Sequence, residues 1–195
     1  MLQKASHPNV AKVKEWFYGT RGKEIIITEY AESLELRIKE KPLTEEEMKP
    51  IVRDVLKALV HLDKKKISHL DVKPANIYLK DNKAFLNNFG FASHYNNLTN
   101  IENPVGTAEY MSPEMQAVPT ADWKNLEKSD IYSLGVTMKQ MLENFETSAS
   151  IELSIFVSSA MSNGAIRPDA TELLEHEWFQ SEKKLWMKKL VNMFK

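Results

Sequence analysis

The first third of the chain carries two short runs of strand-forming residues. Residues 10–18 and 24–30 are rich in β-branched and aromatic side chains, which favour strands. Gly19 and Gly22 lie between the two runs, and glycines at such a place are typical of a hairpin turn. The three consecutive isoleucines of residues 25–27 are typical of a buried strand. The pattern therefore predicts a two-stranded hairpin near the start of the chain.

A long amphipathic helix is predicted over residues 44–66. Thr44 can accept a hydrogen bond from the first turn, and the three glutamates that follow it suit the positive end of the helix dipole. Apolar positions then recur at helical spacing, at Ile51, Val52, Val55, Leu56, Leu59 and Leu62. Because Pro50 lacks a backbone N–H, we expect it to kink this helix or to reset its start.

The rest of the chain predicts one more strand pair and several helices. The strands cover residues 77–79 and 84–87 around the Asp81-Asn82 turn, and the helices cover residues 127–143, 149–161, 169–177 and 180–193. Residues 91–106 are polar and rich in asparagine, which predicts an irregular loop with a functional or mobile role. A few strands followed mostly by helices indicate the α+β fold class.

One polar stretch, residues 68–79, carries the candidate chemistry, because it places an acid, a cation and an amide in a loop between a helix and a strand. Asp71 can accept a proton from a hydroxyl group. Lys73 can neutralise a transferring phosphoryl group, and Asn76 can bind a metal ion through its carbonyl oxygen. The spacing indicates a phosphoryl-transfer loop, and the alternative is a polar turn with unrelated side chains.

Composition narrows the possible functions. The chain has 195 residues, of which 43% are hydrophobic and 27% charged, as in an ordinary globular domain. Its formal net charge of −1 gives no general attraction to nucleic acid or to a membrane surface. The absence of cysteine excludes disulfides, thiol catalysis and cysteine-bound zinc. With no apolar signal core and no run of transmembrane length, we expect a cytoplasmic protein without nucleic-acid or membrane partners.

The polar stretch resembles the catalytic loop of the protein kinase family, written H-R-D-x-x-x-x-N, with Leu70 in the position of the arginine. Further stretches resemble that family, in the right order and over nearly the whole chain. They are His7-Pro8-Asn9-Val10, Thr28-Glu29-Tyr30-Ala31, Asn88-Phe89-Gly90, residues 106–114, residues 129–135 and Arg167-Pro168-Asp169-Ala170. Lys73 and Thr107 are typical of the serine/threonine branch of the family.

The resemblance implies a kinase-like α+β fold with a mostly helical large lobe. Residues 1–31 would be a remnant of the small lobe, made of a strand pair and the hinge, and residues 32–180 would be the large lobe. Residues 181–195 would add a basic amphipathic helix. Strings such as Lys-Pro-Ala-Asn at residues 73–76 and Lys-Ser-Asp-Ile at residues 128–131 look most similar to the NIMA-related branch.

The resemblance also implies roles for individual residues around a bound ATP. Asp71 and Lys73 would be the catalytic residues. The backbone of Glu29 and of Ala31 would face the adenine at the hinge, and Tyr78 would be a further cofactor-binding residue. These positions together imply ATP, with Mg²⁺, as the cofactor.

The metal ion and the scaffold of the site have their own implied residues. Asn76 and Asn88 stand at the two positions that bind Mg²⁺ in the family. Asp130 would brace the backbone of the catalytic loop, and Arg167 would pair with Glu114.

The sequence departs from the family at places that catalysis needs. Only six residues precede His7, and they contain neither the glycine-rich loop nor the Lys–Glu pair that orients the phosphates. Asn88 offers a neutral oxygen where the family has a carboxylate, although Mg²⁺ usually binds through carboxylates. Removing one electrostatic stabiliser from an active site typically costs about 10²–10³ in rate. We therefore expect impaired catalysis and weak or absent binding of ATP and Mg²⁺.

Two further departures concern regulation. Leu70 replaces an arginine that reads a phosphate on the activation segment, so a phosphate on Ser93 or Thr99 would lack that partner. Only 24 residues lie between Leu142 and Arg167, and the family typically has about twice as many, beyond the usual length of a connection. We expect that a helix which helps to dock protein substrates is missing.

The predicted small-lobe remnant would leave apolar surface uncovered. We expect an exposed patch around Val10, Val13, Ile25 and Ile27. It would be covered by a protein partner, by a second copy of the chain, or by polypeptide outside this sequence. The lysine-rich residues 181–195 would bind an acidic partner, calmodulin or a membrane surface, or would pack their apolar side on the large lobe.

Three functional hypotheses stay open from the sequence. The first is a pseudokinase, a kinase-like protein with impaired catalysis that works as a binding or regulatory module. The second is an active ATP-dependent serine/threonine kinase whose N-terminal part lies outside this sequence, or one that uses Asn88 with altered metal demands. The third is a non-functional product of a decayed gene. Upstream coding sequence with a glycine-rich loop would favour the second, and a stable product with a partner would favour the first.

Overall fold

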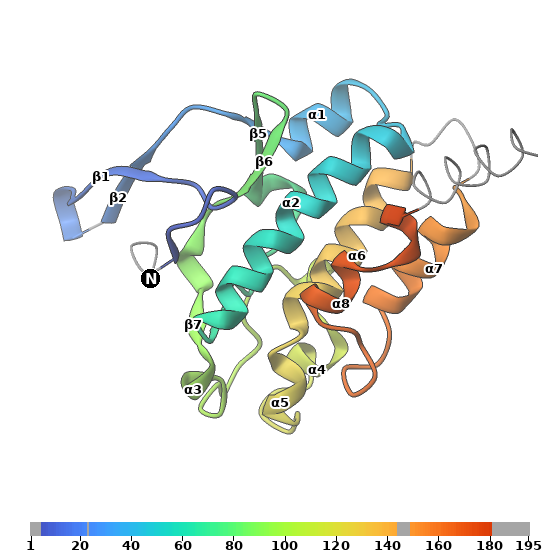
Figure 1. Cartoon of the computed structure of the whole chain (residues 1–195). Coiled ribbons are helices and arrows are strands. Elements are labelled where there is room, and N and C mark those ends of the chain that lie inside the picture. Colours follow the sequence, from blue (N-terminus) through green and yellow to red (C-terminus); the bar gives the residue numbers. More distant parts are fainter. Residues whose placement is uncertain (1–4, 23, 144–148, 181–195) are drawn as a thin grey trace, which may run out of the picture.

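The larger apolar core lies around one long central helix, α2 (Glu45–Lys64), in the computed structural model, which describes residues 5–22, 24–143 and 149–180. α2 packs against strand β6 (Lys83–Leu86) and against helix α8 (Ala170–Leu174). Helix α7 (Ile151–Ala160) packs on helix α6 (Ser129–Leu142), as Figure 1 shows. The mixture of small sheets and helices fits the predicted α+β class.

The central helix is closed at its start by a capping box. The Thr44 side chain accepts the backbone N–H of Glu47, and the Glu47 carboxylate accepts the backbone N–H of Thr44 at 2.7 Å. The predicted helix is thus confirmed, although it ends at Lys64. The expectation that Pro50 resets its start is wrong, because the helix runs unbroken from Glu45 through Pro50. Pro50 is exposed and is the sixth residue of the helix, so the helix continues through it although Pro50 supplies no backbone N–H to the Glu46 carbonyl.

In the described ranges the strands form three small sheets. β1 (Val13–Tyr18) pairs with β2 (Glu24–Thr28), β5 (Ile77–Lys80) lies between β3 (Glu32–Ser33) and β6, and β4 (Ile67–Ser68) pairs with β7 (Ser93–His94), all antiparallel. The turn between β5 and β6 places Asp81 and Asn82 at φ of 51° and 58°. This left-handed backbone is what a two-residue hairpin requires, so the predicted turn is confirmed.

Several short helices complete the fold. They are α1 (Leu34–Glu40), α3 (Tyr95–Leu98), α4 (Pro113–Gln116) and α5 (Trp123–Leu126). The pattern did not predict α1, α4 or α5, and α8 ends before the predicted residue 177. The predicted helix 180–193 lies outside the described residues, apart from Gln180. Within the described part of the chain, none of the helices combines the length and the apolar character needed to cross a membrane.

Residues 91–106 are more ordered than an irregular loop. Within them, β7 pairs with β4, and α3 follows directly. Tyr95 and Leu98 of α3 are buried, and the Tyr95 hydroxyl donates to Asp63 at 2.9 Å. Burial, together with this hydrogen bond, raises the pKa of the Tyr95 phenol. The expectation of an irregular loop is therefore wrong for residues 93–98, because two apolar side chains anchor them.

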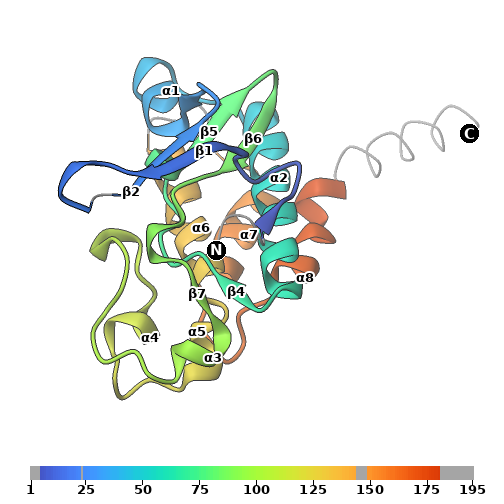
Figure 2. The same cartoon turned by 90° about the vertical axis from the view of Figure 1, so that its left-hand side faces the viewer.

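The β1–β2 hairpin extends away from the body of the molecule, as Figures 1 and 2 show. Ile25 and Ile27 are each 40% exposed, so this part of the predicted apolar patch is confirmed. Trp16, Phe17 and Tyr18 add to it, because all three are exposed. Both faces of the hairpin therefore carry uncovered apolar side chains.

Val10 does not belong to the exposed patch. It is buried and forms a bridge to Leu86 of β6. The backbone N–H of Ala11 donates to the Leu86 carbonyl, and the Leu86 N–H donates to the Asn9 carbonyl, each at 2.9 Å. The expectation for Val10 is wrong because these residues are pinned to the core sheet before the hairpin begins, while Val13 is half-buried.

Two histidines lie together where the N-terminal turn meets α2. The rings of His7 and His61 stack with their centroids 4.9 Å apart. Burial lowers the pKa of both imidazoles, and positive neighbours add to this effect, including Lys57 for His7 and Lys65 for His61.

Stability is therefore expected to fall in mild acid. Unfolded histidine has a pKa of about 6.5, so the unfolded chain binds more protons than the folded chain just below that pH. The two neutral imidazoles make their full contribution to the free energy of unfolding above this value. The contribution is lost as the pH falls through the lowered pKa values of the folded state. The urea midpoint should be lower at about pH 5.5 than at about pH 7.5. Replacing both His7 and His61 by Gln should reduce the difference without abolishing it, because burial also lowers the pKa of His69 and of His176. Equal midpoints in the unmodified protein would contradict the prediction.

Candidate active site

A buried carboxylate on α6 holds the polar loop in place. Asp130 accepts the backbone N–H of His69 at 2.6 Å and that of Leu70 at 2.7 Å. Burial raises the pKa of the Asp130 carboxyl, while His69 and the two backbone donors act against that rise. Leu70 has a φ of 65°, which costs energy for a side chain with a Cβ. Two hydrogen bonds to one carboxylate hold that backbone, so the predicted bracing contact is present.

His69 links the loop to the core. It is fully buried, and its ring lies edge-on to Phe89 with centroids 4.7 Å apart. Its Nδ1 accepts the backbone N–H of Asp71 at 3.2 Å, so its Nε2 is the nitrogen that donates to the Asn87 carbonyl, at 2.8 Å. Burial lowers the pKa of the ring, which favours the neutral form that these two bonds require.

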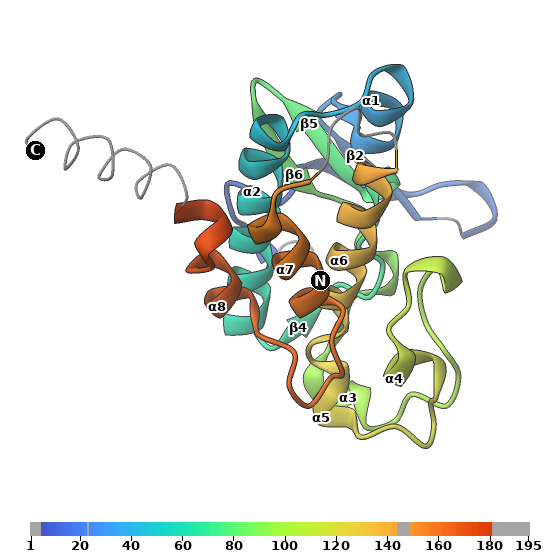
Figure 3. The same cartoon turned by 90° about the vertical axis from the view of Figure 1, so that its right-hand side faces the viewer.

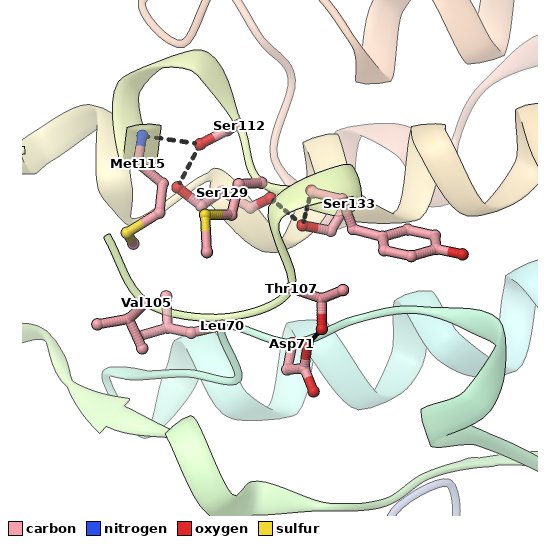
Figure 4. Close-up of a pocket in the computed structure, with 10 residues that line it drawn as sticks. Leu70, Asp71, Val105, Thr107, Ser112, Met115, Ser129 and Ser133 are labelled. Carbon is pink, nitrogen blue, oxygen red and sulfur yellow. Dashed lines mark hydrogen bonds between the residues drawn. The ribbon is translucent and has the colours of Figure 1, made fainter. Parts of the chain in front are cut away.

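Asp71, Lys73 and Thr107 form a compact polar cluster. The Thr107 hydroxyl donates to Asp71 Oδ1 at 2.6 Å and accepts from Lys73 Nζ at 2.5 Å. Lys73 Nζ also lies 3.2 Å from Asp71 Oδ2. The Asp71 carboxylate thus already accepts a hydrogen bond from a threonine hydroxyl, which is the contact that a general base needs to activate a hydroxyl for attack. Figure 4 shows Asp71 and Thr107 facing each other.

Thr107 is a site residue that the pattern analysis did not assign. Gly106 lets it approach, because a Cβ on Gly106 would lie 2.2 Å from the Leu70 carbonyl oxygen. The backbone of Gly106 also has a φ of 113°, which other residues rarely adopt. The Gly-Thr pair was the signal in the sequence that could have located this contact.

An apolar cluster closes the space beside Asp71. Its buried members are Leu70, Tyr95, Leu98, Met115 and Leu126. A cavity of only about 10 Å³ remains between this cluster, Asp71 and the start of α6, as Figure 4 shows. This cavity, which Lys73, Asn76 and Asn88 do not line, has room for about one water molecule.

Asn76 and Asn88 contact each other directly. Asn76 Nδ2 donates to the Asp71 carbonyl at 2.7 Å and to Asp71 Oδ2 at 2.6 Å. Asn88 Nδ2 donates to Asn76 Oδ1 at 3.0 Å. The loop therefore brings the two predicted metal-binding positions together beside Asp71.

These residues do not fit a Mg²⁺ ion. The Asn76 oxygen that would bind the ion already accepts the amide of Asn88, and neither residue brings a negative charge. No group of three or more histidine, aspartate or glutamate side chains in the described ranges is arranged to hold a metal. We therefore derive no catalytic step through the ion.

The predicted hinge residues Glu29 and Ala31 directly precede the edge strand β3, and Tyr78 lies on the middle strand β5. β3 begins directly after Ala31, and Ser33 of β3 pairs with Tyr78 of β5. The Glu29 carboxylate lies 2.9 Å from Lys80 Nζ and 3.5 Å from Lys14 Nζ. The hydrogen bond and charge of Lys80 lower the pKa of Glu29. Ala31 thus lies just before the first paired residue of β3, Glu32, which is opposite Leu79, while the Glu29 side chain faces solvent and lysines.

A buried ion pair joins α4 to the segment before α8. Both Nη atoms of Arg167 donate to the Glu114 carboxylate. Arg167 is 1% exposed, so the predicted pair lies in the interior. Figure 3 shows the two chain segments that it connects, around α4 and before α8.

Comparison with known proteins agrees with this architecture. A family model described as "Protein kinase domain" matches residues 1–163. A Wee1-like protein kinase of Arabidopsis thaliana is 31% identical over 128 residues, which are 55% of this chain and 25% of that protein. The serine/threonine-protein kinase PknB of Mycolicibacterium smegmatis is 38% identical over 76 residues, which are 36% of this chain and 12% of that protein. The matched regions thus span a quarter or less of these relatives. The chain belongs to the protein kinase family.

Proposed function

We propose that this chain is a serine/threonine-kinase-like module that is impaired in phosphoryl transfer and acts by binding another protein in the cytoplasm. The observation that carries the proposal is the hydrogen bond between Asn88 and Asn76 at 3.0 Å. Two neutral amides joined by this bond lie where a kinase holds its metal ion. Asp71 and Lys73 remain well placed for a hydroxyl, but position 88 holds an asparagine where the family has a metal-binding carboxylate.

The magnitude of this loss supports impaired catalysis. Kinases turn over at roughly 1–100 per second. Removing one electrostatic stabiliser costs about 10²–10³ in rate. Even with the remaining loop intact, the loss of the metal carboxylate leaves slow transfer at best. We accordingly expect weak binding of Mg²⁺-bound ATP at the hinge residues Glu29 and Ala31 and at Tyr78.

The binding role is supported by the apolar hairpin. Trp16 and Ile26 face each other across β1 and β2, and 48% and 45% of their surfaces are exposed. Phe17 and Ile25 form the next pair, 46% and 40% exposed. A two-stranded hairpin with apolar side chains on both faces is marginally stable in water. We propose that a protein partner or a second copy of the chain covers it; a monomer in light scattering would contradict the second-copy form.

The finer family assignments are also proposals. The similarity to the NIMA-related branch rests on strings such as residues 73–76 and 128–131. The division into a small-lobe remnant, a large lobe and a basic C-terminal helix rests on the order of the motifs. The basic residues 181–195 lie outside the described residues.

An active kinase is the second candidate, and the Asp71–Thr107 contact at 2.6 Å favours it. In that contact the carboxylate that we propose as catalytic accepts a hydrogen bond from a hydroxyl group. Activity of the whole protein would then depend on residues beyond the matched region, or on a site that works without a carboxylate at position 88.

A phosphoryl-transfer assay separates the two candidates. The purified chain is expected to transfer no labelled phosphate from ATP with Mg²⁺ or Mn²⁺ to a generic serine/threonine substrate, above the level of the Asp71→Asn variant. The reason is the absence of a metal carboxylate beside the catalytic loop. Transfer that Asp71→Asn abolishes would overturn the proposal and establish an active enzyme.

A further inference from the structure

The orientation of the Asn76 amide is determined by its neighbours. Its nitrogen lies 2.7 Å from the Asp71 carbonyl oxygen and 2.6 Å from the Asp71 carboxylate. Both partners are acceptors only, so the NH₂ group must face Asp71. The Asn76 oxygen is then turned away from Asp71 and toward Asn88.

The partner of that oxygen must be a donor or a cation. Asn88 supplies the donor, because its Nδ2 lies 3.0 Å from Asn76 Oδ1. Its own backbone N–H donates to Asn87 Oδ1 at 2.8 Å, and its φ of 59° is a left-handed value that asparagine and aspartate both tolerate. Aspartate could therefore take the same place on the same backbone.

Aspartate in that place would make an unfavourable contact. Two oxygen acceptors would face each other at the distance that Asn88 Nδ2 and Asn76 Oδ1 now share, and only a cation or a proton between them would relieve the repulsion. The Asn88 amide removes this need by placing an N–H between the two side chains. The Asn88 N–H thus takes the place that a divalent cation has between two oxygen ligands.

We propose that the Asn88 carboxamide replaces the divalent cation, and that this site accepts a nucleoside polyphosphate in its metal-free form. The inference rests on the proposed function, since it concerns the ligand of the same impaired site. It adds to the proposed function a ligand that binds without a metal ion.

The charges and donors around Asn88 suit such an anion. The Asp71 carboxylate is already engaged by Thr107, Asn76 and Lys73, and the charges of Asp71 and Lys73 balance. A second carboxylate at position 88 would repel phosphate oxygens, and the amide does not.

Two donors are also left over. Among the described residues, Asn88 Nδ2 has one acceptor and Lys73 Nζ has two, Thr107 Oγ1 and Asp71 Oδ2. One N–H of each nitrogen is thus left for an oxygen from outside. Anionic phosphate oxygens are strong acceptors for an ammonium group and an amide.

The test compares the unmodified chain with Asn88→Asp and with Asn87→Asp. Asn87→Asp is the matched control, because it adds the same charge one residue away and keeps the acceptor for the Asn88 N–H. Binding of Mn²⁺ is followed by electron paramagnetic resonance without nucleotide. Binding of ATP is followed by thermal shift in EDTA and in MgCl₂.

The unmodified chain and Asn87→Asp are expected to show an ATP shift in EDTA that MgCl₂ does not increase. Asn88→Asp should bind Mn²⁺ at least about tenfold more tightly than either, and its ATP shift should require the metal. Asn88→Ala serves as a second variant if Asn88→Asp does not fold, and it should lose the metal-free shift without gaining affinity for Mn²⁺.

Three results would overturn the inference. One is an ATP shift of the unmodified chain that appears only with Mg²⁺. Another is Mn²⁺ binding to the unmodified chain that is as tight as to Asn88→Asp. The last is the absence of any ATP shift in both EDTA and MgCl₂, which would leave the proposal of impaired catalysis standing. Impaired catalysis is tested separately, by the transfer assay.

Discussion

Replacing Arg167 by leucine is expected to lower the free energy of unfolding by about 3–5 kcal/mol, the usual effect of breaking a buried ion pair on one side. All five N–H groups of the guanidinium have acceptors. Nε and Nη2 donate to the Ser162 carbonyl at 3.1 and 2.9 Å, Nη1 donates to the Lys128 carbonyl at 3.0 Å, and both Nη atoms donate to Glu114. Leucine would leave a carboxylate and two carbonyls in the interior without these donors.

Urea unfolding of Arg167→Leu and of two further variants measures the size of this loss of stability. Arg167→Lys keeps the charge but has its three donors on one atom, so it should lose about 2 kcal/mol, less than leucine. The double variant Glu114→Gln, Arg167→Met should recover part of the loss of the single variants, since it removes the unpaired charge. Equal stability of Arg167→Leu and the unmodified protein would show that Glu114 is satisfied by other donors.

Local patterns in the sequence predicted the local parts of the structure well. The α2 cap depends on Thr44 and Glu47 alone, and the β5–β6 turn depends on Asp81 and Asn82. Asp71 and Asn76 lie in one loop, so their hydrogen bond follows from a spacing of five residues. Short-range geometry of this kind can be read from adjacent residues.

Contacts between distant segments were harder to predict. The analysis of single motifs did not assign Thr107 to the site, because its contact with Asp71 depends on a close approach of Gly106 to Leu70. The resemblance placed Asn76 and Asn88 at two metal-binding positions, but the hydrogen bond between them was not predicted, since two asparagines carry no charge pattern that marks a pair. Short helices such as α3 are stabilised by tertiary packing, so their periodicity is too brief to detect.

The burial of Val10 was likewise not predicted from the local sequence pattern. Its apolar neighbours along the chain suggested a place in the exposed hairpin. A parallel bridge to Leu86, 76 residues further along the chain, placed it in the core instead. The pattern distinguishes apolar from polar positions, but it does not show which apolar positions find a partner.

The position of Leu70 leads to the second large expected effect. Leu70 is 6% exposed and lies among Tyr95, Leu98, Met115 and Leu126. These contacts hold residues 93–98 by apolar packing against the loop that carries Asp71. Leu70→Arg would place a guanidinium in this cluster, and we expect a loss of about 3 kcal/mol or more in the free energy of unfolding.

The left-handed backbone at Leu70 does not contribute to the expected loss of stability. Leu70 already has a φ of 65°, and arginine would have the same conformational cost there. Leu70→Met keeps the volume and the apolar character, so it should cost less than about 1.5 kcal/mol. Urea unfolding measures both, and limited proteolysis should show residues 93–98 cut faster in Leu70→Arg alone, because α3 loses its packing there. If Leu70→Arg were as stable as Leu70→Met, the arginine would have found an acceptor, and the segment would not depend on apolar packing at this position.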